Sequence, residues 1–168
     1  MKKSIIIYIF TLVYALANAQ AIKNTATVLF FKENVKIKIY NNFKKDKVIS
    51  CIYDDPVKEN YYVLEVLDLK GNMLKISGSS ILNNKADGWI ESSNIGINTR
   101  SRDNKLLLYE EPSYKAKHIV VYQEDGELVK VTAISSSWLK IVLKCKNKIY
   151  NYWLPSEYQC PNPYTTCN

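Results

Sequence analysis

Apolar and polar residues alternate along most of the chain after its first twenty positions. In residues 35–39 apolar side chains alternate with lysines, and residues 128–134 and 138–143 are rich in β-branched side chains. An apolar period of two is typical of a strand with one buried face, and β-branched residues fit a pleated sheet well. After the first twenty positions no window of ten or more residues shows a convincing helical stripe. The pattern therefore predicts an all-β fold.

Turn-forming residues separate these predicted strands. They lie at residues 54–56, 70–72, 87–88, 111–113, 124–126 and 154–156. Gly, Pro, Asn, Asp and Ser in such clusters favour tight turns. Short strands divided by frequent turns are typical of a sandwich or of small barrels.

The start of the chain has a different pattern. Lys2 and Lys3 precede an uncharged stretch over residues 4–17, which ends in Ala17-Asn18-Ala19. A cationic start, an apolar run and an A-x-A site indicate a signal peptide at residues 1–19, cleaved before Gln20. A transmembrane anchor needs about 20 apolar residues, and this run is shorter. We therefore expect an exported protein, periplasmic or extracellular, without a membrane span after cleavage.

The pattern also repeats within the chain. Five segments of the first half, at 37–40, 47–55, 61–68, 73–76 and 88–95, recur in the same order at 106–109, 117–125, 128–134, 138–141 and 152–158. The pairs Tyr40/Tyr109 and Trp89/Trp153 are 69 and 64 residues apart. A recurring order with small changes of spacing indicates a duplication with loops of different length.

Each repeat carries a short motif in which a strand with a lysine precedes a strand with a tryptophan. The second repeat has WLKI at 138–141 and WLPSEY at 153–158, and the first has MLKI at 73–76 and GWIESSNI at 88–95. Together with LLLYEEPS at 106–113, these motifs resemble the bacterial SH3-like domain, in which "W-x-K-V" precedes "G-W-V" and a short helical turn. Met73 and Tyr152 depart from that pattern, because they stand where the family has tryptophan and glycine.

The resemblance implies two tandem small SH3-like β-barrels at 30–97 and 98–160, followed by a cysteine-containing tail at 161–168. It also implies a non-enzymatic binding protein of the cell envelope, which recognises cell-wall peptides or a surface protein. The alternative is an exported inhibitor or assembly factor that acts on a partner protein.

The charge of the chain adds a weak preference for acidic partners. The formal net charge of +7 falls to +5 when Lys2 and Lys3 are removed with the signal peptide. This balance favours weak attraction to anionic cell-surface polymers or acidic proteins. Nucleic acid is not an expected partner, because Arg100 and Arg102 are the only arginines and nucleic-acid readers rely on arginine forks.

Four cysteines give an even count in an oxidising compartment. Cys160 and Cys167 flank a proline turn, which predicts a disulfide between them. Cys51 and Cys145 are either a second bridge or small hydrophobic residues. No cysteine pair has C-x-x-C spacing and the chain has one histidine, so we expect no metal site and no cofactor.

Catalytic chemistry is not indicated by the sequence. His118 lies in a predicted strand without a recognisable nucleophile partner, which acid–base activation would require. The acidic pairs lie in predicted turns, whereas catalytic carboxylates converge across a cleft. The glycines are isolated and form no phosphate loop. We therefore expect no enzyme activity.

Aromatic residues crowd the second repeat and are the candidate ligand-binding residues. They are Tyr109, Tyr114, Trp138, Tyr152, Trp153 and Tyr158. Tyrosine and tryptophan offer rigid contact area with a polar tip; alternatively they fill the core and the seam between repeats. We expect Tyr152 on an exposed face and Trp153 as a packing residue.

Overall fold

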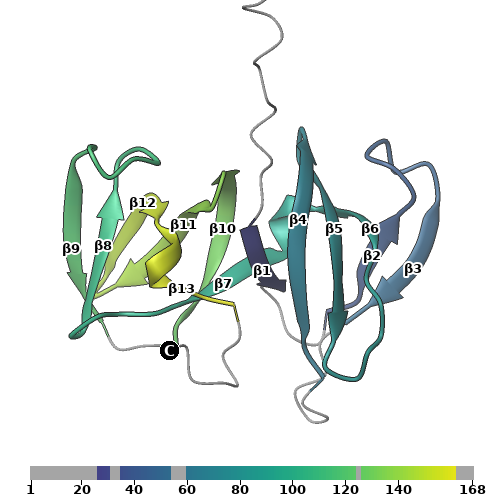
Figure 1. Cartoon of the computed structure of the whole chain (residues 1–168), viewed down its shortest axis with the longest axis horizontal. Helices are drawn as coiled ribbons and strands as arrows, with labels where there is room; N and C mark the ends of the chain where they lie inside the picture. Colours follow the sequence, from purple (N-terminus) through teal and green to yellow (C-terminus); the bar gives the residue numbers. More distant parts are fainter. Residues whose placement is uncertain (1–25, 31–34, 54–59, 124–125, 162–168) are drawn as a thin grey trace, which may run out of the picture.

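The architecture is all-β, as the alternation predicted, and is arranged as two lobes side by side (Figure 1). The computed structural model describes residues 26–30, 35–53, 60–123 and 126–161. The predicted signal peptide at 1–19 and the tail residues 162–168 lie outside these ranges. No helix within the described residues is long and apolar enough to cross a membrane.

All strands pair in antiparallel fashion. The first half contains β1 (Ala26–Phe30), β2 (Ile37–Tyr40), β3 (Val48–Ile52), β4 (Tyr62–Lys70), β5 (Met73–Ser80), β6 (Gly88–Glu91), the 3-10 turn η2 (Ser92–Asn94) and β7 (Ile95–Thr99). The second half contains β8 (Lys105–Tyr109), β9 (His118–Tyr122), β10 (Leu128–Ser135), β11 (Trp138–Cys145), β12 (Lys148–Leu154), the 3-10 turn η3 (Ser156–Tyr158) and β13 (Gln159–Cys160).

The same strand pairing occurs in both halves. Along the sheet the order is β3-β2-β6-β5-β4-β1 and then β7-β10-β11-β12-β8-β9, with β13 on β7. Strand β7 has the same place in the second half as β1 has in the first. Strand β1 pairs with the long strand β4 and with β7, the last strand of the first half, and β7 pairs with the long strand β10 and with β13, the last strand of the second half. The predicted boundary between residues 97 and 98 falls inside this shared strand.

The register of the strands repeats as well. The β4–β5 pairing shifts between Val66 and Asp68, and the β10–β11 pairing shifts between Val131 and Ala133, 65 residues later. Tyr40 opposes Trp89, just as Tyr109 opposes Trp153. A β-bulge bends its strand and increases the twist, so both halves curl at the same place.

The sheet does not close into barrels by hydrogen bonding, which differs from the expected architecture. Its path ends at β3 and β9. In the second half β9 nevertheless bends back toward the interior strands. Cys145 Sγ lies 3.7 Å from the carbonyl oxygen of Tyr122, and Gln123 Nε2 donates to Thr99 Oγ1 at 2.6 Å. Within the part of the chain that the structure describes, side-chain contacts and no backbone ladder connect β9 to β7 and β11.

One hydrophobic core runs through both halves. Its fully buried members include Ile39, Leu64 and Ile90 in the first half and Leu108 and Leu139 in the second. Strand β7 joins the two, because all five of its residues are buried. Aliphatic side chains at alternating positions supply most of this core, and their removal from water is the main force that holds such sheets together.

Candidate functional site

Three aromatic side chains of the second half meet on the outer face of the sheet. Trp138, at the start of β11, lies 4.8 Å from Tyr114 and 5.3 Å from Tyr109, measured between ring centroids. Tyr109 and Tyr114 are 5.9 Å apart, edge to face. We call Tyr109, Tyr114 and Trp138 the aromatic cluster. Offset and edge-to-face rings at these distances attract one another beyond their apolar contact.

Strand alternation places the cluster on this face. Leu108 belongs to the core, so its neighbour Tyr109 points to the opposite side. Tyr109 opposes Trp153 on β12, and Trp153 opposes Lys140 on β11. Cross-strand partners share a face, which means that Tyr109, Trp153 and Lys140 form one row outside the core.

The cluster has a covered base and an exposed top. Tyr109 and Trp138 are 6 % and 8 % exposed, whereas Tyr114 is 60 % exposed. Tyr114 lies in the β8–β9 loop, whose ends are joined by a hydrogen bond from the Glu110 amide to the Lys117 carbonyl at 3.0 Å. The loop therefore holds an accessible aromatic ring against two buried ones.

A carboxylate borders the cluster. The Tyr114 hydroxyl donates to Glu157 Oε2 at 2.8 Å, and Glu157 belongs to η3. Burial and Glu157 together raise the pKa of Tyr114 and of Tyr109 above the ordinary tyrosine value. Both hydroxyls are therefore protonated at neutral pH. The site combines aromatic faces, hydroxyl groups and one acidic acceptor, which suits a ligand with apolar parts and N–H or O–H donors.

Tyr158 is a structural residue. It is 7 % exposed, belongs to the hydrophobic core, and has the guanidinium of Arg102 at 5.9 Å from its ring centroid. Burial raises the pKa of Tyr158, and the charge of Arg102 opposes that shift. Of the six predicted binding residues, Tyr109, Tyr158 and Trp138 are the most buried, at 6 %, 7 % and 8 % exposed.

The expected faces of Tyr152 and Trp153 are reversed in the structure. Tyr152 is half-buried and packs against the core on the same side of β12 as the fully buried Leu154. Trp153 points to the outer face, where Lys140 Nζ lies 5.9 Å from its ring centroid. The buried Leu154 fixes the alternation of the strand, so Tyr152, two residues earlier, turns inward in spite of its size.

The first half has a counterpart that the sequence analysis missed. Trp89 packs 5.7 Å from Phe43, and Lys70 Nζ lies 4.9 Å from the Phe43 centroid and 5.6 Å from that of Trp89. Phe43 comes from the β2–β3 loop, where Lys45 forms an ion pair with Glu91 at 2.6 Å. The equivalence of this loop to the β8–β9 loop is the signal that could have revealed it.

The other polar candidates do not form a second site. His118 is exposed, with its ring 5.3 Å from Tyr109, and no group of His, Cys, Asp or Glu suited to a metal occurs in the described part of the chain. Cys51 is an exposed free thiol and Cys145 a half-buried one, so they do not form the second bridge. Cys160 is buried; Cys167 lies outside the described residues, so their predicted disulfide stays a prediction.

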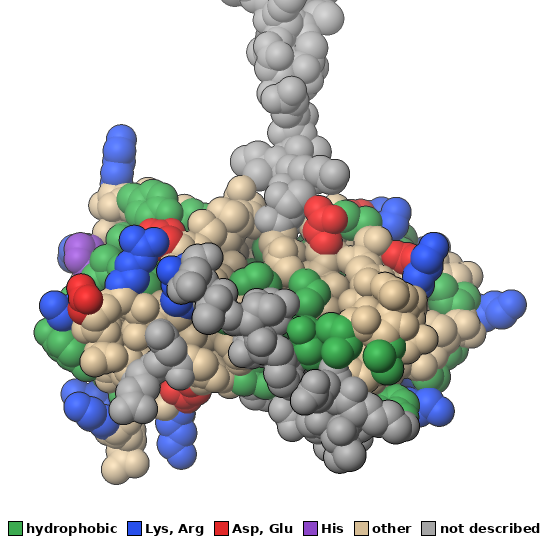
Figure 2. Space-filling view, turned by 60° about the horizontal axis from the view of Figure 1, so that its bottom comes forward, with side chains coloured by type: hydrophobic (Ala, Val, Ile, Leu, Met, Phe, Trp, Pro, Cys, Tyr) green, Lys and Arg blue, Asp and Glu red, His purple; other side chains and the backbone are tan. Residues whose placement is uncertain are grey.

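The surface carries no concentrated basic patch on the face that Figure 2 presents. Lysine and arginine side chains stand out around both lobes there, while hydrophobic side chains gather nearer the middle. Comparison of the chain with known protein families, curated proteins and solved structures found no match. Its function therefore has to be argued from the site itself.

Proposed function

We propose that this chain is an exported, non-enzymatic binding protein of the cell envelope, which holds a cell-wall peptide at the aromatic cluster. One observation carries the proposal: the ring of Tyr114 is 60 % exposed and lies tilted against the buried Trp138, with the ring centroids 4.8 Å apart. A side chain this exposed contributes little to the stability of the fold, whereas rigid aromatic rings over a packed base are typical of binding hot spots. The motifs at the chain start support export.

An SH3-like architecture for each half is part of this proposal. It is supported by the repeated pairing of the strands and by the short 3-10 turn that follows each tryptophan strand. In the family that the sequence resembles, a short helical turn follows the corresponding strand. We propose small barrels whose sheet stays open between β9 and β7, joined there by Gln123 and Thr99.

Binding to purified cell wall tests the proposal with two matched tyrosines. Tyr114 and Tyr122 are both 60 % exposed, but of these two tyrosines only Tyr114 belongs to the aromatic cluster. We expect mature protein to sediment with purified sacculi, and Tyr114→Ala to weaken binding about 30-fold, the effect of losing roughly 2 kcal/mol at a hot spot. Tyr122→Ala should bind like the wild type. Equal binding by the two variants, or none by the wild type, would contradict the proposal.

The runner-up is an inhibitor or assembly factor that docks on a partner protein through β3. This strand ends the sheet, and its first four residues, Val48 to Cys51, are all exposed. An exposed apolar edge is a template for pairing with another strand. Ile49→Lys should then abolish capture of one envelope protein while leaving binding to sacculi unchanged.

A further inference from the structure

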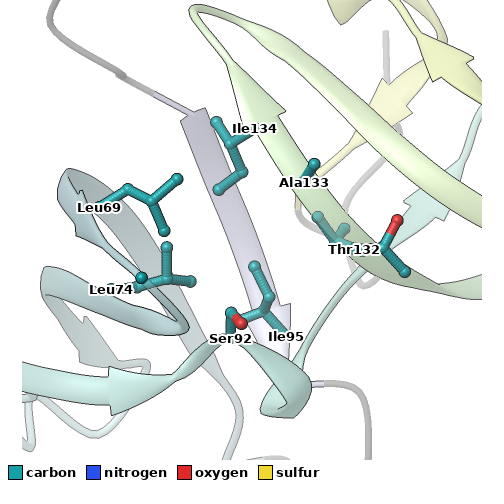
Figure 3. A pocket seen from close by; sticks show the side chains of 9 residues that line it. Leu69, Leu74, Ser92, Ile95, Thr132, Ala133 and Ile134 are labelled. Carbon is teal, nitrogen blue, oxygen red and sulfur yellow. The ribbon is translucent and has the colours of Figure 1, made fainter.

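An apolar pocket lies at the junction of the two halves, away from the aromatic cluster (Figure 3). It has a volume of about 210 Å³. Its apolar walls are Leu69, Leu74, Ile95, Val131 and Ile134, and its small residues are Gly71, Ser92, Thr132 and Ala133. Figure 3 shows Leu69 and Leu74 on one side, Ile134 facing them from β10, and Ile95 below.

The duplication itself creates this pocket. Leu69 and Ile134 occupy equivalent positions, 65 residues apart, and each follows the bulge of its long strand. A bulge bends the strand away from its regular path. Leu69 and Ile134 therefore line the pocket from the two halves at equivalent positions.

The pocket is a partly open hollow against the hydrophobic core, and its lining also includes the exposed Gly71 and Thr132. Leu74, Ile95 and Val131 are each 1 % exposed and belong to the same cluster as the rest of the core. Protein interiors are normally packed with few voids larger than a water molecule. An aliphatic cavity of about 150 Å³ in another protein stays dry and binds benzene, so this one has room for a somewhat larger molecule.

The lining selects an uncharged ligand. No charged side chain lines the pocket, and burying an unpaired charge is strongly unfavourable. Two polar side chains, Ser92 and Thr132, belong to the lining. The Thr132 hydroxyl donates to the Lys140 carbonyl at 3.2 Å, whereas the Ser92 hydroxyl lies beside Ile95 at the floor in Figure 3. A neutral molecule with a single hydrogen-bonding group matches this arrangement.

We propose that this pocket binds a small neutral aromatic molecule of one or two fused rings, held between the aliphatic walls of the two halves with its polar group toward Ser92. Because the pocket draws its walls from both repeats, such a ligand would strengthen their contact. This proposal is independent of the ligand at the aromatic cluster.

Indole is a suitable probe, because it is neutral, fused-ring and carries one N–H donor. Methyl NMR of the mature protein should show saturable shifts at Leu69, Leu74, Ile95, Val131 and Ile134, and the melting temperature should rise with indole concentration. Tyr114→Ala should bind indole unchanged, which separates this pocket from the aromatic cluster.

Filling the pocket should remove binding. Ser92→Leu places a larger side chain at its floor and should weaken indole binding at least tenfold. Ser156→Leu is the matched control, because Ser156 is the equivalent residue 64 positions later, starts η3 and is exposed; it should bind indole normally. Leu69→Phe, which narrows the pocket from the opposite wall, provides a second filled variant should Ser92→Leu fold poorly.

Two results would overturn the proposal. The first is an absence of saturable methyl shifts in the wild type, with Ser92→Leu melting higher than the wild type, which would make the pocket a simple packing gap. The second is unchanged indole binding in a folded, filled variant, which would place the molecule elsewhere.

Discussion

Equivalent tryptophans in the two halves have different surroundings. Trp89 is 7 % exposed beneath Phe43, with Lys70 beside both rings. Trp153 is half-buried, with Lys140 as its cation neighbour. In the second half the loop aromatic, Tyr114, lies against Trp138. In both halves a buried tryptophan thus lies under an exposed loop ring, 39 % exposed at Phe43 and 60 % exposed at Tyr114.

Truncation of the cluster should separate stability from binding. Trp138→Ala removes a ring that is 8 % exposed, and loss of a large buried side chain costs about 3–5 kcal/mol. Tyr114→Ala, which removes an exposed ring, should cost less than about 1 kcal/mol. Urea unfolding followed by fluorescence measures both. A larger loss for Tyr114→Ala would mean that the loop, and not the tryptophan, holds the cluster together.

The tyrosines predict a loss of stability in alkaline solution. Burial is the main cause that raises the pKa of Tyr109, Tyr114 and Tyr158 above the ordinary tyrosine value of 10.0. The unfolded chain therefore loses these protons first as the pH increases, and the stability that the neutral hydroxyls supply is complete below pH 10 and falls above it.

Denaturant titrations between pH 8 and 11 check this dependence. The pKa of Lys45 is also raised, chiefly by its hydrogen bond to Glu91, and a raised lysine pKa acts in the same direction. Tyr114→Phe isolates the tyrosine contribution, because it keeps the ring and removes the titrating group. If the free energy of unfolding falls with pH equally in the wild type and in Tyr114→Phe, Tyr114 does not contribute to the alkaline loss of stability.

At the scale of elements, a loop completes the aromatic group in each half. The β2–β3 and β8–β9 loops each fold over the outer face and bring an aromatic ring to it, Phe43 and Tyr114 respectively. The strands underneath supply the base of each group through fixed alternation. A loop that lays an aromatic ring over the sheet therefore occurs once in each half.

One glycine fixes the approach of two long strands. A Cβ at Gly78 in β5 would collide with the carbonyl oxygen of Val63 in β4, so Gly78→Ala forces the backbones apart. We expect a loss of about 1–3 kcal/mol, the usual cost of overpacking. Ser79→Ala, at the exposed neighbouring position, is the control and should change little. Thermal melting compares the two variants. Equal melting temperatures would show that the β4–β5 hairpin accommodates the added Cβ without losing stability.

At the scale of the molecule, the shared strand β7 should make the two halves unfold together. It pairs with β1 of the first half and with β10 and β13 of the second. Ile97, at its centre, is 0 % exposed. Removing such a side chain to alanine costs about 2–5 kcal/mol, and the loss should affect both lobes.

Pulse hydrogen exchange in urea tests this coupling. In Ile97→Ala the amides of β5 and of β11 should lose protection at the same, lowered urea concentration. Lowered protection in β11 alone, with β5 unchanged, would show that the halves are separate folding units.

The sequence by itself determined the all-β class, the repeat and the crowding of aromatics in the second half, but not strands β1, β7 and β13. These follow from local rules: period two, turn residues and recurring spacing. The faces of Tyr152 and Trp153 were predicted wrongly, because the argument rested on the size of a neighbouring residue and not on the buried Leu154 that sets the alternation.

Only the tertiary structure decided how the repeats join and which aromatics meet. The sharing of β7, the open sheet and the pocket between Leu69 and Ile134 depend on pairings between residues far apart in the chain. The same holds for Tyr114 on Trp138, since a loop can place its ring in many positions until the strands beneath offer a partner. Local patterns specify which residues can face a core, but long-range pairing energies select the neighbours of each residue.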